Sequence, residues 1–70
     1  MKQISAMMAG TVVEILVAKG DQVSDGQDVV IIESMKMQLP VTSEIAGMVD
    51  LVKVTAGEFV NEGDVLIVLS

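Results

Sequence analysis

Residues 20–26 read Gly20-Asp21-Gln22-Val23-Ser24-Asp25-Gly26, and residues 57–63 repeat the pattern as Gly57-Glu58-Phe59-Val60-Asn61-Glu62-Gly63. Both copies end in a glycine that can supply the positive φ of a tight turn. The match continues outward, since Gly10 aligns with Gly47 and, after a one-residue gap, Ser34 aligns with Ser70. Two copies are too few for a solenoid, so the repeat predicts one domain with internal two-fold pseudo-symmetry.

The segments between the glycines have the composition of β-strands. Val and Ile dominate them, and turn residues separate them at short intervals. Glu14 and Asp50 fall out of phase in the alignment of the halves, which predicts a bulge or a register difference. Two short antiparallel sheets that close on each other would protect the strand edges of so small a domain. No helix is predicted, and the predicted strands are Gln3–Met7, Thr11–Val17, Gln22–Val23, Asp28–Ser34, Gln38–Thr42, Met48–Val54, Phe59–Val60 and Asp64–Leu69.

The composition excludes several classes of function. The 70 residues include no cysteine and no histidine, which removes thiol chemistry, the commonest general base and the commonest transition-metal ligand. Phe59 is the only aromatic residue, so no base-stacking platform can form, and the net charge of −6 repels nucleic acid and anionic membranes. No apolar run is long enough to span a membrane, and no signal peptide is recognised. The expected location is therefore the cytoplasm.

The tripeptide Met35-Lys36-Met37 lies between the two central predicted strands, where a hairpin tip is expected. Such tips are normally built from Gly, Asn, Asp or Pro. Two large apolar side chains around one amine contribute little to folding when exposed, so we expect a partner protein to recognise them. The second half of the repeat ends at Ser70 without such a tip. The pseudo-symmetry therefore predicts Lys36 at one end of the molecule and the termini at the other.

The stretch Glu33-Ser34-Met35-Lys36-Met37 resembles the biotin attachment signature, whose usual form is Glu-Ala-Met-Lys-Met. The two glycine runs are similar to the two turns of biotinyl and lipoyl domains. The resemblance covers about Ile4 to Ser70, and the length is most similar to that of the small free-standing biotin/lipoyl attachment proteins. It implies an all-β domain over residues 1–70, a flattened β-barrel or sandwich (barrel-sandwich hybrid) of two four-stranded antiparallel sheets with Lys36 at a hairpin tip.

The resemblance also implies a carrier rather than an enzyme. Biotin protein ligase would join biotin to the Lys36 amine as an amide, and Glu33, Ser34, Met35 and Met37 would serve recognition by the ligase or its partner enzymes. Biotin carboxylase would then load a carboxyl group onto the biotin, and a carboxyltransferase would pass it to an acceptor. No catalytic residue, metal, nucleic acid or membrane is implied. The cofactor supplies the chemistry and the protein supplies its presentation.

The sequence departs from the family pattern at four positions. Ser34 replaces the usual Ala, and Gln38 stands where Glu often follows the second methionine. The signature Ala-Pro-Met-Pro-Gly of the first strand is present as Ala6-Met7-Met8-Ala9-Gly10, so both prolines are absent. These changes leave the lysine and its two flanking methionines in place.

Other interpretations of the tip stay open at this point. Lipoyl domains share the fold and the lysine, although their tip usually reads Asp-Lys-Ala, so lipoate or dual modification is an alternative to biotin. An unmodified structural or binding barrel is a further alternative. Lys36 could also be an ordinary solvated turn lysine, with Met35 and Met37 as core filler. Asp21, Asp25 and Asp28 superficially suggest a calcium loop, but their spacing is wrong for one, and turn chemistry explains them better.

Overall fold

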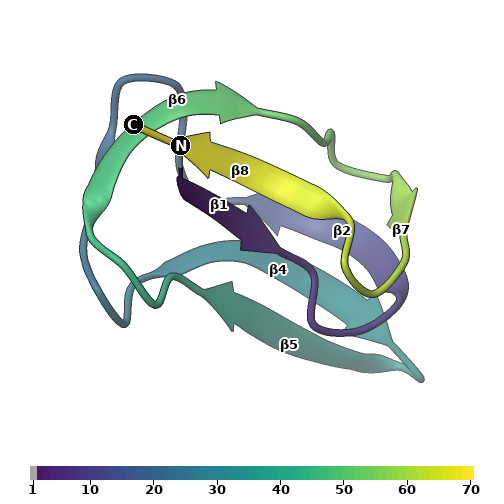
Figure 1. Cartoon of the computed structure of the whole chain (residues 1–70). Helices are drawn as coiled ribbons and strands as arrows, with labels where there is room; N and C mark the ends of the chain where they lie inside the picture. Colours follow the sequence, from purple (N-terminus) through teal and green to yellow (C-terminus); the bar gives the residue numbers. More distant parts are fainter. Residues whose placement is uncertain (1) are drawn as a thin grey trace.

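In the computed structural model the chain folds into eight β-strands (Figure 1). The model describes residues 2–70, which is all of the predicted domain except Met1. All eight predicted strands are present, with ends that shift by up to two residues. Composition predicts strand at Val17 and Val54, yet these two residues lie in loops, where they are buried against the core. The strands are β1 (Lys2–Ser5), β2 (Gly10–Ile15), β3 (Gln22–Val23), β4 (Asp28–Ser34), β5 (Met37–Thr42), β6 (Gly47–Val52), β7 (Phe59–Val60) and β8 (Val65–Leu69).

The strands form two four-stranded sheets that face each other. One sheet has the order β1-β8-β6-β3 and the other β5-β4-β2-β7, and every pairing is antiparallel. Each order converts into the other when every strand is exchanged for its counterpart in the opposite half of the chain. The structure therefore confirms the predicted all-β sandwich and its internal two-fold pseudo-symmetry.

The bulges obey the same symmetry. The β2–β4 register shifts between Val12 and Glu14, and the β6–β8 register shifts between Val49 and Leu51. The extra residue is Val13 in the first half and Asp50 in the second, which are equivalent positions of the repeat. This confirms the irregularity predicted from the phase of the charged residues, since one extra residue reverses the inward and outward alternation beyond it.

The turns between strands are built from the repeated glycine runs. Gly26 and Gly63 have φ of 87° and 91°, as the sequence predicted, and their N–H groups donate to the carbonyls of Ser43 and Ala6. A side chain at either position would be strained by this backbone conformation. The acidic residue of the first run also acts in a turn, because the Asp21 carboxylate accepts a hydrogen bond from the Ala18 N–H at 2.8 Å.

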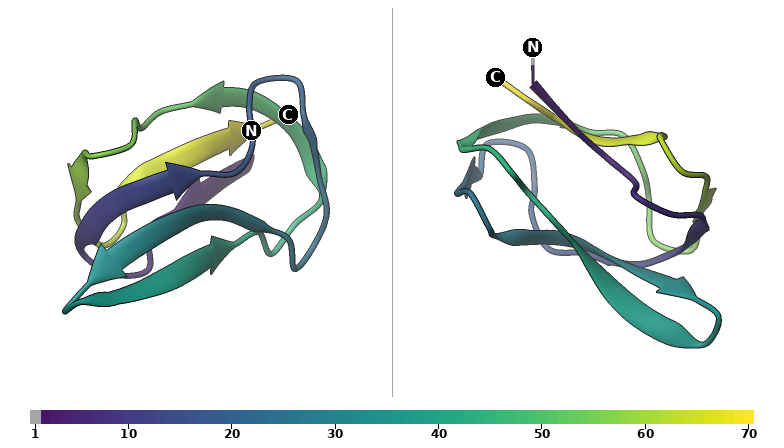
Figure 2. Two further views of the ribbon diagram at one scale, coloured as in Figure 1. Left: turned by 180° about the vertical axis from the view of Figure 1, so that it is seen from behind. Right: turned by 60° about the horizontal axis from the view of Figure 1, so that its bottom comes forward.

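The core lies between the two sheets and consists of aliphatic side chains from both halves. Residues such as Ile32, Leu66 and Ile67 are completely buried. The molecule measures 31 × 19 × 18 Å along its principal axes, and within residues 2–70 no helix of the length and apolarity of a membrane span occurs. The β4–β5 hairpin projects at one end of the molecule, and the start of β1 and the end of β8 lie at the opposite end (Figures 1 and 2). This is the arrangement that the pseudo-symmetry predicted.

Candidate functional site

The tip of the β4–β5 hairpin is a two-residue turn with an uncommon backbone. Ser34 pairs with Met37, so Met35 and Lys36 are the two central residues. Their φ angles are 53° and 64°, which is the signature of a type I′ turn. Among the described residues they are the only non-glycine residues with positive φ. A turn that normally takes Asn-Gly here carries two long side chains, and such left-handed residues concentrate at functional sites.

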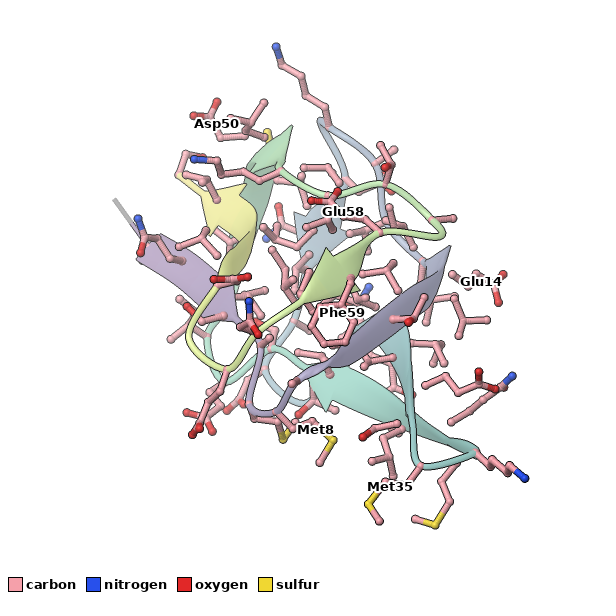
Figure 3. All side chains as sticks on the ribbon, turned by 90° about the vertical axis from the view of Figure 1, so that its right-hand side faces the viewer. Met8, Glu14, Met35, Asp50, Glu58 and Phe59 are labelled. Atoms are coloured by element: carbon pink, nitrogen blue, oxygen red, sulfur yellow. The ribbon has the colours of Figure 1, made fainter. Side chains whose placement is uncertain are left out.

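The side chains at the tip are directed into solvent. Met35 is 91% exposed and Met37 is 58% exposed, which contradicts the alternative that they fill the core. Lys36 is exposed as well, and none of the side-chain hydrogen bonds within residues 2–70 involves its amine. The tip thus presents a free primary amine between two thioether side chains, and Figure 3 shows Met35 at the lower end of the molecule.

The strand that leads into the hairpin tip is hydrogen-bonded to neighbours on both sides. This strand, β4, is an interior strand that pairs with β2 on one side and β5 on the other. Gly10 at the start of β2 permits an unusually close approach, because a Cβ atom at this position would lie only 2.7 Å from the Glu33 carbonyl oxygen. Pairing on both sides fixes the direction of β4 up to Glu33, and Ser34 still pairs with Met37 of β5, so the backbone of the hairpin tip is held while the exposed Lys36 side chain has no partner that restrains it.

The predicted recognition residues divide between the two faces of the hairpin. Glu33 is exposed on the outer face of the sheet, while Ser34 is half-buried on the face that continues from Ile32. Met37 pairs with Ser34 and therefore lies on that same inner face. All of these residues lie in the turn, in the Ser34–Met37 pair that closes it or in the next pair along the hairpin, and none of them forms part of the core.

Phe59 lies on the same outer face as Glu33 and is not among the predicted site residues. It is 61% exposed and pairs with Thr11, which pairs with Glu33, which pairs with Gln38. These four residues form one row across the outer face of the lysine-bearing sheet. The aligned position in the other half of the repeat is Gln22, so the replacement of a polar residue by the only aromatic residue was the available signal.

The family model described as "Biotin-requiring enzyme" matches residues 2–69. The chain is 49% identical over 67 residues to the biotin/lipoyl attachment protein of Bacillus subtilis, covering 96% of this chain and 92% of that one. It is 38% identical over 69 residues to the biotinylated protein TB7.3 homolog of Mycobacterium leprae, covering 99% of this chain and 97% of the relative. It also covers half of the biotin carboxyl carrier protein of Streptococcus mutans, at 42% identity over 93% of its own length.

Solved structures show the same fold inside much larger enzymes. Kluyveromyces lactis urea carboxylase matches with a TM-score of 0.91 and 29% identity, over 99% of this chain and 6% of that one. A single-chain, multi-domain long-chain acyl-CoA carboxylase matches with a TM-score of 0.87 and 36% identity, over 94% of this chain and 7% of the enzyme. The fold, the extent of the family match and these identities agree, and the chain therefore belongs to the biotin/lipoyl attachment family as a biotin carrier domain.

Proposed function

We propose that residues 1–70 act as one biotin carrier domain and that Lys36 is the residue to which biotin is attached. One observation supports this proposal most directly: Lys36 is an exposed amine that makes no side-chain hydrogen bond within residues 2–70 and lies at the projecting end of a paired hairpin. Such an amine fits a group that must be attached by one enzyme and used by others. Once bound through an amide, biotin supplies the capacity to accept a carboxyl group and release it again.

The residues of the chain position and present the cofactor without taking part in the transfer chemistry. The Lys36 side chain supplies a flexible stem of four methylene groups, and β4 and β5 hold its base at the end of the molecule. No His or Cys is available for general base or nucleophilic catalysis. The tip lies at the opposite end of the molecule from the end of β8 (Figure 2), so an enzyme can approach Lys36 without contacting that strand end.

Recognition by biotin protein ligase is proposed to depend on the apolar pair beside the lysine. Met35 and Met37 expose thioether side chains that contribute little to the core, so these side chains are available for contact with a partner. Glu33 adds a charge on the outer face, and Ser34 borders the inner face. A biotin carboxylase and a carboxyltransferase are the further partners that such a carrier requires. The cytoplasmic location stays a prediction from the sequence.

The proposal is tested by incubating the chain with biotin, ATP and biotin protein ligase, followed by intact mass and peptide mapping. One biotin on Lys36 is expected, with none in Lys36→Arg. Lys19→Arg is the matched control, because Lys19 is also an exposed turn lysine. Biotin in Lys36→Arg would place the site on another lysine. A parallel reaction with lipoate ligase measures selectivity, and exclusive lipoylation would contradict the proposal.

The contribution of the methionines is measured in the same assay. Met35→Ala and Met37→Ala are expected to slow labelling by at least tenfold while the thermal midpoint changes little. Met48→Ala is the control, since Met48 is 49% exposed on the opposite sheet. Labelling rates equal to that of the control would show that the ligase does not recognise these two side chains.

A further inference from the structure

An apolar groove lies beside the lysine hairpin, on its inner face. Its volume is about 180 Å³, and the surface that lines it is almost entirely apolar. The groove forms where the loop between β1 and β2 crosses the inner side of the hairpin. The lining residues are Met7, Met8, Ile32, Leu39, Pro40 and Val41.

The groove begins close to the turn that carries Lys36. Ile32 pairs with Leu39, and this pair lies two residues below the Ser34–Met37 pair that closes the turn. At a strand rise of about 3.3 Å per residue, the separation along the hairpin is about 7 Å. Because residues two apart face the same side, Met37 lies between the tip and Leu39 on one continuous inner face. A group on Lys36 can therefore reach the groove by passing over Met37.

The loop supplies two methionines to this groove. Met7 is 56% exposed and Met8 is half-buried, and Figure 3 shows Met8 at the same end of the molecule as Met35. Met7 occupies the position where the family signature has a proline. A methionine there replaces a rigid ring by a flexible thioether that adapts its shape to what it contacts. Met7, Met8 and Met37 give this inner face a surface of soft apolar atoms.

We propose that this groove reversibly binds the biotin group carried on Lys36 when that group is not in an enzyme's active site, an inference that rests on the proposed function. The cofactor has an apolar five-membered thioether ring and an aliphatic chain, which match a groove lined by methionine and aliphatic side chains. Its ureido ring needs water or polar partners, and the open side of the groove leaves that edge in solvent. In this arrangement carbon and sulfur atoms of the cofactor would be buried in the groove, and its polar ureido atoms would keep their hydrogen bonds to water.

The size of the groove makes this contact weak and reversible. Pockets that enclose a drug-sized ligand measure about 300–1,000 Å³, so a hollow of about 180 Å³ covers only part of the group. A short flexible tether gives an effective concentration on the order of millimolar. A contact with a dissociation constant near that value would be occupied about half of the time. Such a contact limits exposure of the apolar ring and does not prevent its entry into a partner's active site.

The test is an NMR comparison of the unmodified and biotinylated chain, each labelled with ¹³C in its methionine methyl groups. Mass spectrometry first establishes one biotin on Lys36. Biotinylation is expected to shift the methyl signals of Met7 and Met8 and to produce NOEs from them to the protons of the thioether ring. Met48 on the opposite sheet is the internal control and should not move. Shifts confined to Met35 and Met37, without ring NOEs at Met8, would overturn the proposal.

Two variants separate the groove from general effects of modification. Met7→Gln keeps the side-chain length and places an amide in the groove, so the NOE intensity at Met8 should fall at least twofold. Met48→Gln, at a similarly exposed position, should leave that intensity unchanged. Equal intensities in both variants would contradict the assigned lining. Spectra at two protein concentrations identify a second copy as the occupant, because its contacts would weaken on dilution, and that result would also overturn the proposal.

The experiments distinguish a failure of the proposed attachment at Lys36 from a failure of the proposed groove. If Lys36 carries no biotin, the proposed function is wrong, and the groove is then tested with biotin methyl amide added to the unmodified chain at millimolar concentration. Saturable shifts at Met7 and Met8 support the groove under either outcome of the mass analysis. If biotin methyl amide causes no such shifts up to about ten times the effective concentration that a tether provides, the proposed binding in the groove is refuted.

Discussion

Replacement of the lysine turn by Met35→Asn with Lys36→Gly should stabilise the folded protein while it removes the proposed attachment site. Both residues have positive φ, 53° and 64°, and this conformation costs an ordinary L-residue about 1–2 kcal/mol. Asn and Gly adopt it more readily, and they are the favoured pair in type I′ turns. Met35 is 91% exposed, so its removal sacrifices almost no packing, and the amine of Lys36 has no hydrogen bond to lose among the described residues.

The net gain follows from two opposing terms. Relief of the left-handed strain favours the variant, in full at the glycine and only in part at the asparagine, whereas glycine loses about 0.5–1 kcal/mol more backbone entropy on folding. The expected increase in the free energy of unfolding is therefore about 1–2 kcal/mol, which corresponds to a rise of about 4–16 °C in Tm for a domain of this size. Circular dichroism in urea and on heating is the suitable assay, because the chain has no Trp or Tyr for fluorescence.

Gly57→Ala provides the control with the opposite sign. Its φ is 94°, and a Cβ atom at that position would meet nothing within 4 Å, so any loss of stability comes from backbone conformation alone. We expect a loss of about 1–2 kcal/mol. If Gly57→Ala shows this loss while the turn variant is no more stable than the original chain, the inference of strain at Met35 and Lys36 is refuted.

Three further substitutions test the framework around the site by urea unfolding. Gly10→Ala should cost about 1–3 kcal/mol, because its Cβ would lie 2.7 Å from the Glu33 carbonyl, and more than Gly47→Ala, where the nearest atom is at 3.1 Å. Equal losses would show that β2 and β4 can separate without cost. Leu66→Ala should cost about 2–5 kcal/mol, since Leu66 is completely buried, and a loss below 1 kcal/mol would indicate a core that collapses around the cavity. Ser43→Ala should cost about 1–3 kcal/mol by removing the acceptor of a backbone N–H, and an unchanged midpoint would mean that water replaces it.

The strands could be predicted because local composition and the internal repeat agreed with each other. Their ends could not, since a valine such as Val17 or Val54 has the same strand preference whether it lies in a strand or is buried in a loop. The order of strands within each sheet was also beyond the sequence. Alternation with a period of two shows which side of a strand is apolar but does not identify its neighbours, and β1 pairs with β8 at the other end of the chain.

The site was predicted in part for a similar reason. The Met-Lys-Met tripeptide indicated an exposed tip, and the structure confirms that exposure. The left-handed conformation of Met35 and Lys36 was not foreseen, because neither residue favours it, and it is imposed by the pairing of Ser34 with Met37. The groove was missed altogether, because it arises where Met7 and Met8 meet residues of β4 and β5 that are distant in sequence.

The internal repeat explains why the lysine lies where it does. β4 and β8 are equivalent strands, each in the interior of its sheet with neighbours on both sides. The chain ends just after β8, whereas after β4 it turns at Lys36 and returns as β5. An interior strand cannot bend without breaking hydrogen bonds on both sides, so it can hold a turn whose backbone is unfavourable. A turn on the short strands β3 or β7 would relax or fray instead. The proposed attachment at the end of β4 would therefore combine a fixed backbone with a mobile side chain, as expected for a cofactor that is presented to partner enzymes from one defined position.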